Sequence, residues 1–107
     1  MIDRLNASAI GLNGGNGQGL PTELSNKYPT TVFKFARRGA KGADVEVIGG
    51  DHPSLYPGST WSYRNNYGDF KPSSISGVRR FLREIKKGKL PSNTEIIEYD
   101  TKTGKIK

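Results

Sequence analysis

Apolar and polar positions along the chain follow two different periods, and these divide it into strands, turns and one helix. Residues 30–38, with the sequence TTVFKFARR, alternate and are rich in β-branched and aromatic side chains, which predicts a strand. Residues 39–50, GAKGADVEVIGG, hold a second short apolar run between glycines and predict its hairpin partner. Residues 61–72, WSYRNNYGDFKP, resume an extended pattern that Pro72 ends.

A helical period replaces this alternation in residues 73–91. Ser73 or Ser74 can cap the start of the helix, and Gly88 followed by Pro91 ends it. Apolar positions recur every three or four residues, so we expect one face of this helix to pack in the core through Ile75, Val78, Phe81, Leu82 and Ile85.

The order of these elements predicts the fold class. Residues 94–107, TEIIEYDTKTGKIK, predict a strand, a turn and a short return strand. The order β, β, loop, β, α, β and hairpin indicates an α+β domain, with a small mixed β-sheet packed against one main amphipathic helix. Residues 11–19 hold five glycines in nine positions, so we expect residues 1–29 to be a flexible Gly/Asn-rich lead-in and residues 30–107 a single domain.

Length and composition exclude several classes of protein. The chain has 107 residues and no cysteine, so it suits one domain without disulfides, thiol chemistry or Cys-based zinc sites. No apolar run approaches the roughly 18 residues of a membrane span, and the N-terminus lacks the features of a signal peptide. We therefore expect no membrane span, and any export would depend on something outside this chain.

The formal net charge of +7 is concentrated in residues 31–107, because the charges in the first 30 residues cancel. The cations of the predicted helix stand against Glu84 alone and are Arg79, Arg80, Arg83, Lys86, Lys87 and Lys89. Such a field favours a polyanion, and nucleic acid is the natural candidate. A surface kept basic for solubility, or matched to an acidic protein, remains an alternative.

Aromatic side chains gather in the same part of the chain as Arg64. Rings interleaved with cations can stack on bases while the cations hold phosphates, which would make Arg64 a nucleic-acid contact. A small domain also needs such rings in its core. Both interpretations apply to Tyr56, Trp61, Tyr63, Tyr67 and Phe70.

An acid and a lysine stand two positions apart at Asp69 and Lys71, so on a strand their side chains share a face. If this strand pairs with the preceding one, Asp44 or Glu46 can join them. Two converging carboxylates can hold a divalent metal ion, and a lysine beside them can orient a water molecule. The alternative is a surface charge pair, with Asp44 satisfying turn amides.

The chain's single histidine, His52, offers a different chemistry. A base that titrates near neutral pH could remove the 2′-hydroxyl proton of RNA, with Arg64 or Lys71 stabilising the developing charge. His52 lies between Asp51 and Pro53, which also suits a residue that serves only a turn. A zinc site is poorly supported, because one histidine and no cysteine leave only carboxylates as further ligands.

The segments GADVEVI and GDFKP, followed by a basic amphipathic helix and a closing strand, resemble the core of the PD-(D/E)XK nucleases, the restriction-endonuclease-like superfamily. The resemblance covers roughly residues 30–100. It implies a restriction-endonuclease-like core in which Asp44 and Asp69 bind a divalent metal ion, Mg²⁺ or similar. It also implies that Lys71 positions the attacking water.

The whole chain, small, basic and cysteine-free with a glycine-rich entry and the ending GKLPSNTEIIEYDTKTGKIK, resembles the C-terminal toxin domains of bacterial polymorphic and contact-dependent growth inhibition toxins. This resemblance implies a domain delivered by a larger secreted or cell-surface protein, acting in the cytoplasm of a target cell. It also implies an immunity protein, which we expect to be acidic.

Our leading hypothesis is an antibacterial toxin nuclease that cleaves DNA or RNA by metal-dependent hydrolysis. Asp44, Asp69 and Lys71 would carry the reaction, and phosphates would be bound by Arg64, Arg79, Arg80, Arg83, Lys86 and Lys87. Three alternatives remain: a metal-independent ribonuclease with His52 as general base, a non-catalytic nucleic-acid-binding module, and a domain that docks on an acidic protein.

Overall fold

The computed structural model describes residues 19–37 and 40–107. In chain order, the elements are helix α2 (Leu20–Lys27), strands β1 (Thr31–Phe35) and β2 (Val45–Gly50), the 3₁₀ turn η1 (Pro53–Leu55), strand β3 (Tyr67–Pro72), helix α3 (Ile75–Lys86) and strand β4 (Thr94–Tyr99).

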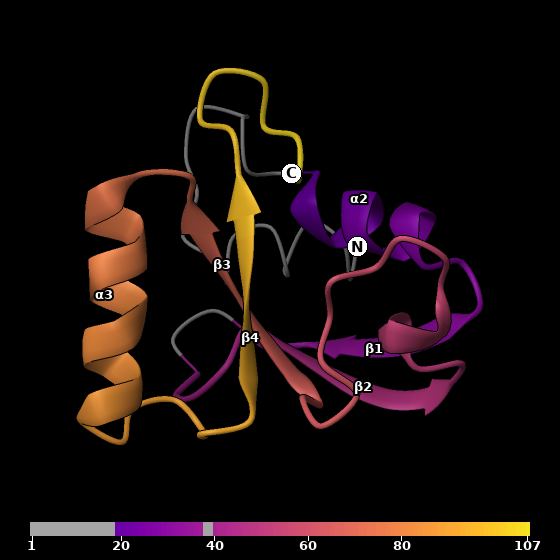
Figure 1. Cartoon of the computed structure of the whole chain (residues 1–107), viewed down its shortest axis with the longest axis horizontal. Coiled ribbons are helices and arrows are strands. Elements are labelled where there is room, and N and C mark those ends of the chain that lie inside the picture. The colour runs from indigo at the N-terminus through magenta and orange to yellow at the C-terminus, as the bar shows by residue number, and fades with distance from the viewer. Residues whose placement is uncertain (1–18, 38–39) are drawn as a thin grey trace.

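The four strands form one mixed sheet in the order β1-β2-β3-β4. The pairs β1–β2 and β2–β3 are antiparallel, whereas β3 and β4 run parallel and are joined by α3. In Figure 1, α3 and α2 lie on opposite sides of the β3–β4 pair. The predicted α+β class, with a small mixed sheet against one main helix, is confirmed.

The side of the sheet that faces α2 holds the main hydrophobic core. Aromatic rings dominate it, and Tyr28 lies at its centre, with edge-on contacts to Phe33, Tyr56 and Trp61. Other buried core residues come from α2 and from every strand except β1, and they are Leu20, Leu24, Val45, Phe70, Ile97 and Tyr99. Most of the apolar burial that stabilises this domain is therefore on one side of the sheet.

Helix α2 changes the expected extent of the domain. Leu20 and Leu24 are fully buried in the core, although they precede residue 30, where we expect the domain to begin. The Glu23 carboxylate also accepts a hydrogen bond of 3.1 Å from the backbone N–H of Ile106, which ties α2 to the C-terminal segment. The folded domain thus includes residues 20–29. The rest of the predicted lead-in, residues 1–18, lies outside the described residues.

Helix α3 begins and ends close to the predicted positions, but it buries only part of the expected face. The Ser74 hydroxyl caps the helix by accepting a 3.0 Å hydrogen bond from Gly77 N–H. The buried residues of α3 are Gly77 and Phe81, whereas Ile75 and Leu82 are 74% and 59% exposed. The expectation of core burial is confirmed for Phe81 and wrong for Ile75 and Leu82, because the helix is rotated so that Glu84 faces the sheet beside Phe81.

Gly77 allows this close approach of helix and strand. A Cβ atom at Gly77 would lie 2.2 Å from the carbonyl oxygen of Pro72, at the end of β3. No side chain fits there without moving the first turn of α3 away from the sheet. The glycine inside an otherwise good helix is therefore explained by packing, which a helical pattern does not reveal.

Strand β3 is shorter than the extended pattern suggests, because residues 61–66 lie outside it and include a turn at Tyr63 and Arg64. The Asn65 carbonyl accepts a 2.8 Å hydrogen bond from the Trp61 indole, and the Asn65 amide donates to the Glu95 carboxylate at 2.7 Å. The expected return strand at the C-terminus is reduced to one bridge, between Tyr99 and Ile106. Within residues 19–37 and 40–107, no helix has the length and apolar character to cross a membrane.

Candidate active site

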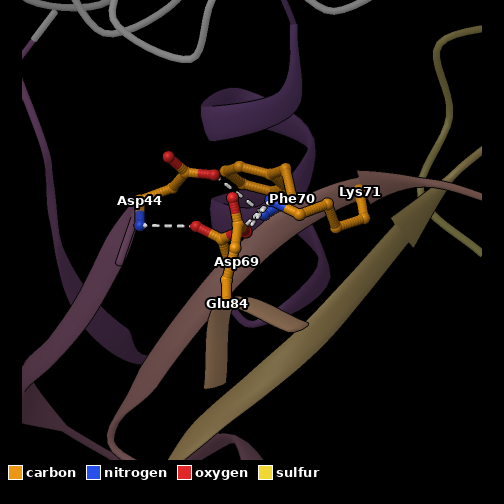
Figure 2. A network of polar contacts seen from close by, with 5 residues as sticks. All are labelled: Asp44, Asp69, Phe70, Lys71 and Glu84. Carbon is orange, nitrogen blue, oxygen red and sulfur yellow. Dashed lines mark hydrogen bonds and ion pairs between the residues drawn. The ribbon is translucent and has the colours of Figure 1, made fainter. Parts of the chain in front are cut away.

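The pairing of β2 with β3 places Asp44 opposite Asp69. Val45 pairs with Gly68, so the next position of this antiparallel register joins Asp44 to Asp69, with both side chains on the α3 side of the sheet. The Asp69 carboxylate accepts a 3.2 Å hydrogen bond from Asp44 N–H, and the Asp44 carboxylate accepts one of 2.9 Å from Phe70 N–H. Each carboxylate is thus held by the backbone of the other segment (Figure 2).

Lys71 joins this pair of acids to helix α3. Its ammonium group forms an ion pair with Asp69 Oδ2 and lies 3.0 Å from Glu84 Oε1. Asp69 and Lys71 are only 3% and 5% exposed, so both charges are withdrawn from water. Figure 2 shows Asp44, from the residue before β2, converging with Asp69 and Lys71 of β3 and Glu84 of α3.

The proximity of these groups alters their proton affinities. Burial, together with the neighbouring charge of Asp69, raises the pKa of Asp44 from its ordinary value of 3.8 to about 8. Burial by itself would lower the pKa of the Lys71 ammonium, but the hydrogen bond and charge of Asp69, aided by Glu84, raise that pKa above its ordinary value. In the free protein at neutral pH, Lys71 is therefore charged and Asp44 holds a proton.

The four groups lie in a cavity of about 800 Å³. Within the described part of the chain, three cations also line it, and each comes from a different segment: Lys41 from the β1–β2 connection, Arg80 from α3, and Lys89 from the turn after α3. We call Lys41, Arg80 and Lys89 the rim cations. The cavity therefore combines buried acids with an exposed positive rim, an arrangement that attracts an anion toward carboxylates.

Asp44 and Asp69 suit an ion such as Mg²⁺, which needs few protein ligands, better than a metal ion that takes all its ligands from the protein. Mg²⁺ is commonly held by one or two carboxylates, together with water and substrate phosphates, which matches Asp44 and Asp69. Among the described residues, no group of three or more His, Cys, Asp or Glu side chains is placed to hold a metal ion. The donor set thus suits an ion whose remaining ligands are water or phosphate oxygens.

His52 does not line this cavity. Its Nε2 lies 2.8 Å from the Asn65 carbonyl and donates to it, while Nδ1 accepts a 3.1 Å hydrogen bond from Ser54 N–H. The ring also packs edge-on against Trp61, at a centroid distance of 6.5 Å. Both ring nitrogens are engaged in capping η1 and anchoring the turn at Asn65, so the structure gives His52 a structural position apart from Lys71.

The predicted phosphate-binding residues separate into two groups. Arg80 lines the cavity, whereas the other predicted cations of α3 and its C-cap are exposed outside it, namely Arg79, Arg83, Lys86 and Lys87. Arg64 lies 5.4 Å from the centre of the Tyr63 ring and donates to its hydroxyl, also away from the cavity. Of the aromatic cluster, Trp61 and Phe70 are buried in the core.

Sequence reasoning did not assign three of the residues that line this cavity, Glu84, Lys41 and Lys89. Glu84 carried a usable signal, because a single acid among the cations of a helix is well placed to pair with a buried charge. Lys89 carried only the positive charge that it shares with the other cations of residues 73–91, and Lys41 carried no signal, since it lies in an irregular segment whose path depends on the folded chain. No family model, curated protein or solved structure matches this chain.

Proposed function

We propose that this domain is a nuclease that hydrolyses phosphodiester bonds with a divalent metal ion. The observation that supports the proposal best is the convergence of Asp44, Asp69 and Lys71 in one cavity with cations at its rim. Burying Asp69 and Lys71, and part of Asp44, costs stability, because each group loses hydration. Such groups gathered in a cavity, one of them with a pKa far from its ordinary value, are typical of a reactive site.

The proposed reaction gives each group a role. The oxygen of a water molecule bonds to phosphorus, the bond to the leaving oxygen breaks, and the proton lost by the water is balanced by one that the leaving oxygen gains. Asp44 and Asp69 would hold the metal ion, which when bound supplies positive charge to the phosphoryl oxygens. Lys71, fixed by Asp69 and Glu84, would orient the attacking water.

We further propose that the domain acts as an antibacterial toxin module, delivered by a larger secreted or cell-surface protein into a target-cell cytoplasm. This part rests on the resemblance of the whole chain to polymorphic toxin domains and on its net charge of +7. An acidic immunity protein would neutralise it in the producing cell. Expression in a bacterial cytoplasm should arrest growth, and Lys71→Met should abolish the arrest. Growth arrest that persists in Lys71→Met would contradict a toxic nuclease centred on Lys71.

The activity can be tested with purified protein on single-stranded DNA, duplex DNA and RNA, with Mg²⁺ or Mn²⁺ and with EDTA. Asp44→Asn, Asp69→Asn and Lys71→Met should each lower cleavage on the order of 100-fold or more. Asp51→Asn and Lys34→Met remove the same charges at exposed positions outside the cavity and should cleave like the wild type.

Two outcomes would redirect the assignment. Full cleavage in EDTA, lost in His52→Ala, would replace the metal mechanism by a ribonuclease led by His52. Salt-sensitive binding without cleavage in any metal would instead indicate a non-catalytic nucleic-acid-binding module.

A further inference from the structure

The cations of this protein are not equivalent, because the tertiary structure separates those at the cavity from those elsewhere. Helix α3 shows this most clearly, since Arg79 and Arg80 are adjacent in sequence but only Arg80 lines the cavity. A reading of the helix by charge alone treats the two arginines as equal. The folded domain distinguishes them.

The side of α3 away from the cavity does not have the character of a phosphate-binding surface. Ile75 and Leu82 are exposed there, at positions i and i+7, and Arg79 and Lys86 follow each of them by four residues. Phosphate groups gain nothing from exposed aliphatic side chains. The cations on this side therefore stand in a mixed apolar and basic stripe.

The rim cations are instead directed by the fold to a common cavity. Lys89 follows Gly88, whose φ of +75° ends the helix, and Lys89 N–H donates a 2.9 Å hydrogen bond to the Glu84 carbonyl. The backbone carbonyl of Glu84 therefore fixes the turn that carries Lys89, and the side chain of Glu84 contacts Lys71. Lys41 precedes Gly42, with φ +94°, in the connection that leads to Asp44.

We propose that Lys41, Arg80 and Lys89 form the phosphate-binding site of this domain, and that they hold the backbone of a nucleic acid strand across the cavity. This inference rests on the proposed function and specifies where its substrate lies. Three cations from three segments surround one opening, so they can contact successive phosphates on either side of the bond above Asp69 and Lys71. Such contacts position a strand without selecting its sequence.

The buried charges explain why a dedicated rim is needed. Asp69 and Glu84 are acidic groups that would repel a phosphate from the cavity, and Lys71 is already paired with both. Additional positive charge at the opening offsets that repulsion and guides the strand inward. The stripe on the far side of α3 lies outside this opening and cannot serve that purpose.

The test compares two triple variants that remove the same charge. The rim variant removes the three rim cations by Lys41→Ala, Arg80→Ala and Lys89→Ala. The outer variant removes three cations of α3 that lie outside the cavity, by Arg79→Ala, Arg83→Ala and Lys86→Ala. Binding of a fluorescent 12-nucleotide single strand, the matching duplex and an RNA of equal length is measured by anisotropy in EDTA, across a range of salt concentrations. Far-ultraviolet circular dichroism checks that both variants are folded.

The rim variant should lose on the order of 100-fold in affinity, and the slope of log affinity against log salt should shrink by about 2 for a single strand, as three lost phosphate contacts predict. The outer variant should lose no more than about 3-fold, the share expected from net charge alone. Whichever of the three probes, single-stranded DNA, duplex DNA or RNA, binds most tightly identifies the form of nucleic acid that the rim cations bind.

Equal losses in the two variants, or a larger loss in the outer one, would overturn the inference, as would a wild type that binds no nucleic acid. The single substitutions Arg80→Met and Arg79→Met repeat the comparison with neighbouring residues of one helix, in case a triple variant is unfolded. Because binding is measured in EDTA, it does not depend on cleavage. A wild type that binds through the rim but never cleaves leaves the rim assignment intact and removes the proposed catalysis.

Discussion

The two faces of the sheet differ in almost every physical respect. The face toward α2 is closed by aromatic and aliphatic side chains, with Tyr28, Trp61 and Phe70 among those buried. The face toward α3 buries Asp69 and Lys71, and Phe81 is the large apolar side chain that α3 contributes beneath it. One face supplies the hydrophobic free energy of folding, while the other holds charges whose burial reduces it.

Strand β3 belongs to both faces at once. Asp69 and Lys71 point toward α3, and Phe70 between them points into the core. Burial of the Phe70 ring next to the ion pair holds the strand in the sheet, although hydration of Asp69 and Lys71 would favour an exposed strand. A stable face thus allows the other face to be polar.

The largest effect on stability is expected from the apolar face. Phe70→Ala should lower the free energy of unfolding by about 3–5 kcal/mol, because it leaves a cavity in the core. Leu82→Ala is the control on α3, where the side chain is exposed, and should cost less than about 0.5 kcal/mol. Urea unfolding followed by Trp61 fluorescence measures both. A large loss of stability in Leu82→Ala would mean that Leu82 is buried in the core, as the helical pattern of the sequence predicts, and would contradict the packing of α3 described here.

The next largest effect is expected at the polar face. Lys71→Met should lower the free energy of unfolding by about 3 kcal/mol, because it leaves Asp69 buried without its counter-ion. Adding Asp69→Leu and Glu84→Gln to Lys71→Met should recover most of that stability while cleavage remains absent. If the triple variant stays as unstable as Lys71→Met, the loss of stability does not come from the unpaired charge of Asp69, and the ion pairs themselves stabilise the fold.

Removal of metal should expose a dependence of stability on pH. In EDTA, the unfolded chain loses the Asp44 proton near pH 3.8, whereas the folded protein keeps it to about pH 8. The folded state binds more protons in this interval, so the free energy of unfolding should fall as pH rises from about 4 to 8. Asp44 is partly exposed, which limits the change to on the order of 2 kcal/mol.

Asp44→Asn serves as the comparison for this pH dependence, because its amide cannot ionise. The variant should show a flatter profile of unfolding free energy, and it should be more stable than the wild type above pH 8. Identical profiles for the two proteins would show that Asp44 titrates at its ordinary pKa.

The smallest effect is expected at Glu84, on the edge of the polar face. Glu84→Ala removes the contact to Lys71 and should cost about 1–2 kcal/mol in stability and about 10-fold in cleavage rate. Glu84→Gln retains an oxygen that accepts from the ammonium and should recover part of the rate. If Glu84→Gln and Glu84→Ala lower the cleavage rate equally with an unchanged KM, the negative charge of Glu84 is what the reaction needs, and the hydrogen bond to Lys71 alone is not enough.

The local elements were largely predictable. Alternation over residues 30–38 and 61–72 contained β1 and β3, and the Ser74 cap and Gly88 bounded α3 closely. The shared direction of Asp69 and Lys71 followed from the period of a strand. These are properties of neighbouring residues, so the sequence contains them directly.

The rotation of α3 was not predictable from its periodicity. Ile75 and Leu82 have the right spacing for a core face, yet the helix approaches Pro72 closely at Gly77 and is rotated so that Phe81 is buried while Ile75 and Leu82 are exposed. The same rotation brings Glu84 to Lys71 and leaves Arg79 outside the cavity. The placement of His52 was not predictable for a related reason, since its Nε2 donates to the carbonyl of Asn65, 13 positions further along the chain.

The sequence by itself determined the fold class, the strand that carries Asp69 and Lys71, and the excess of positive charge, because local periodicity and composition fix these. The tertiary structure alone decided that Asp44 lies opposite Asp69, that Glu84 completes the pairing of Lys71, and which cations surround the cavity. These depend on strand register, helix rotation and the course of two turns. Each is set by packing between segments far apart in the chain, so no short stretch of sequence contains it.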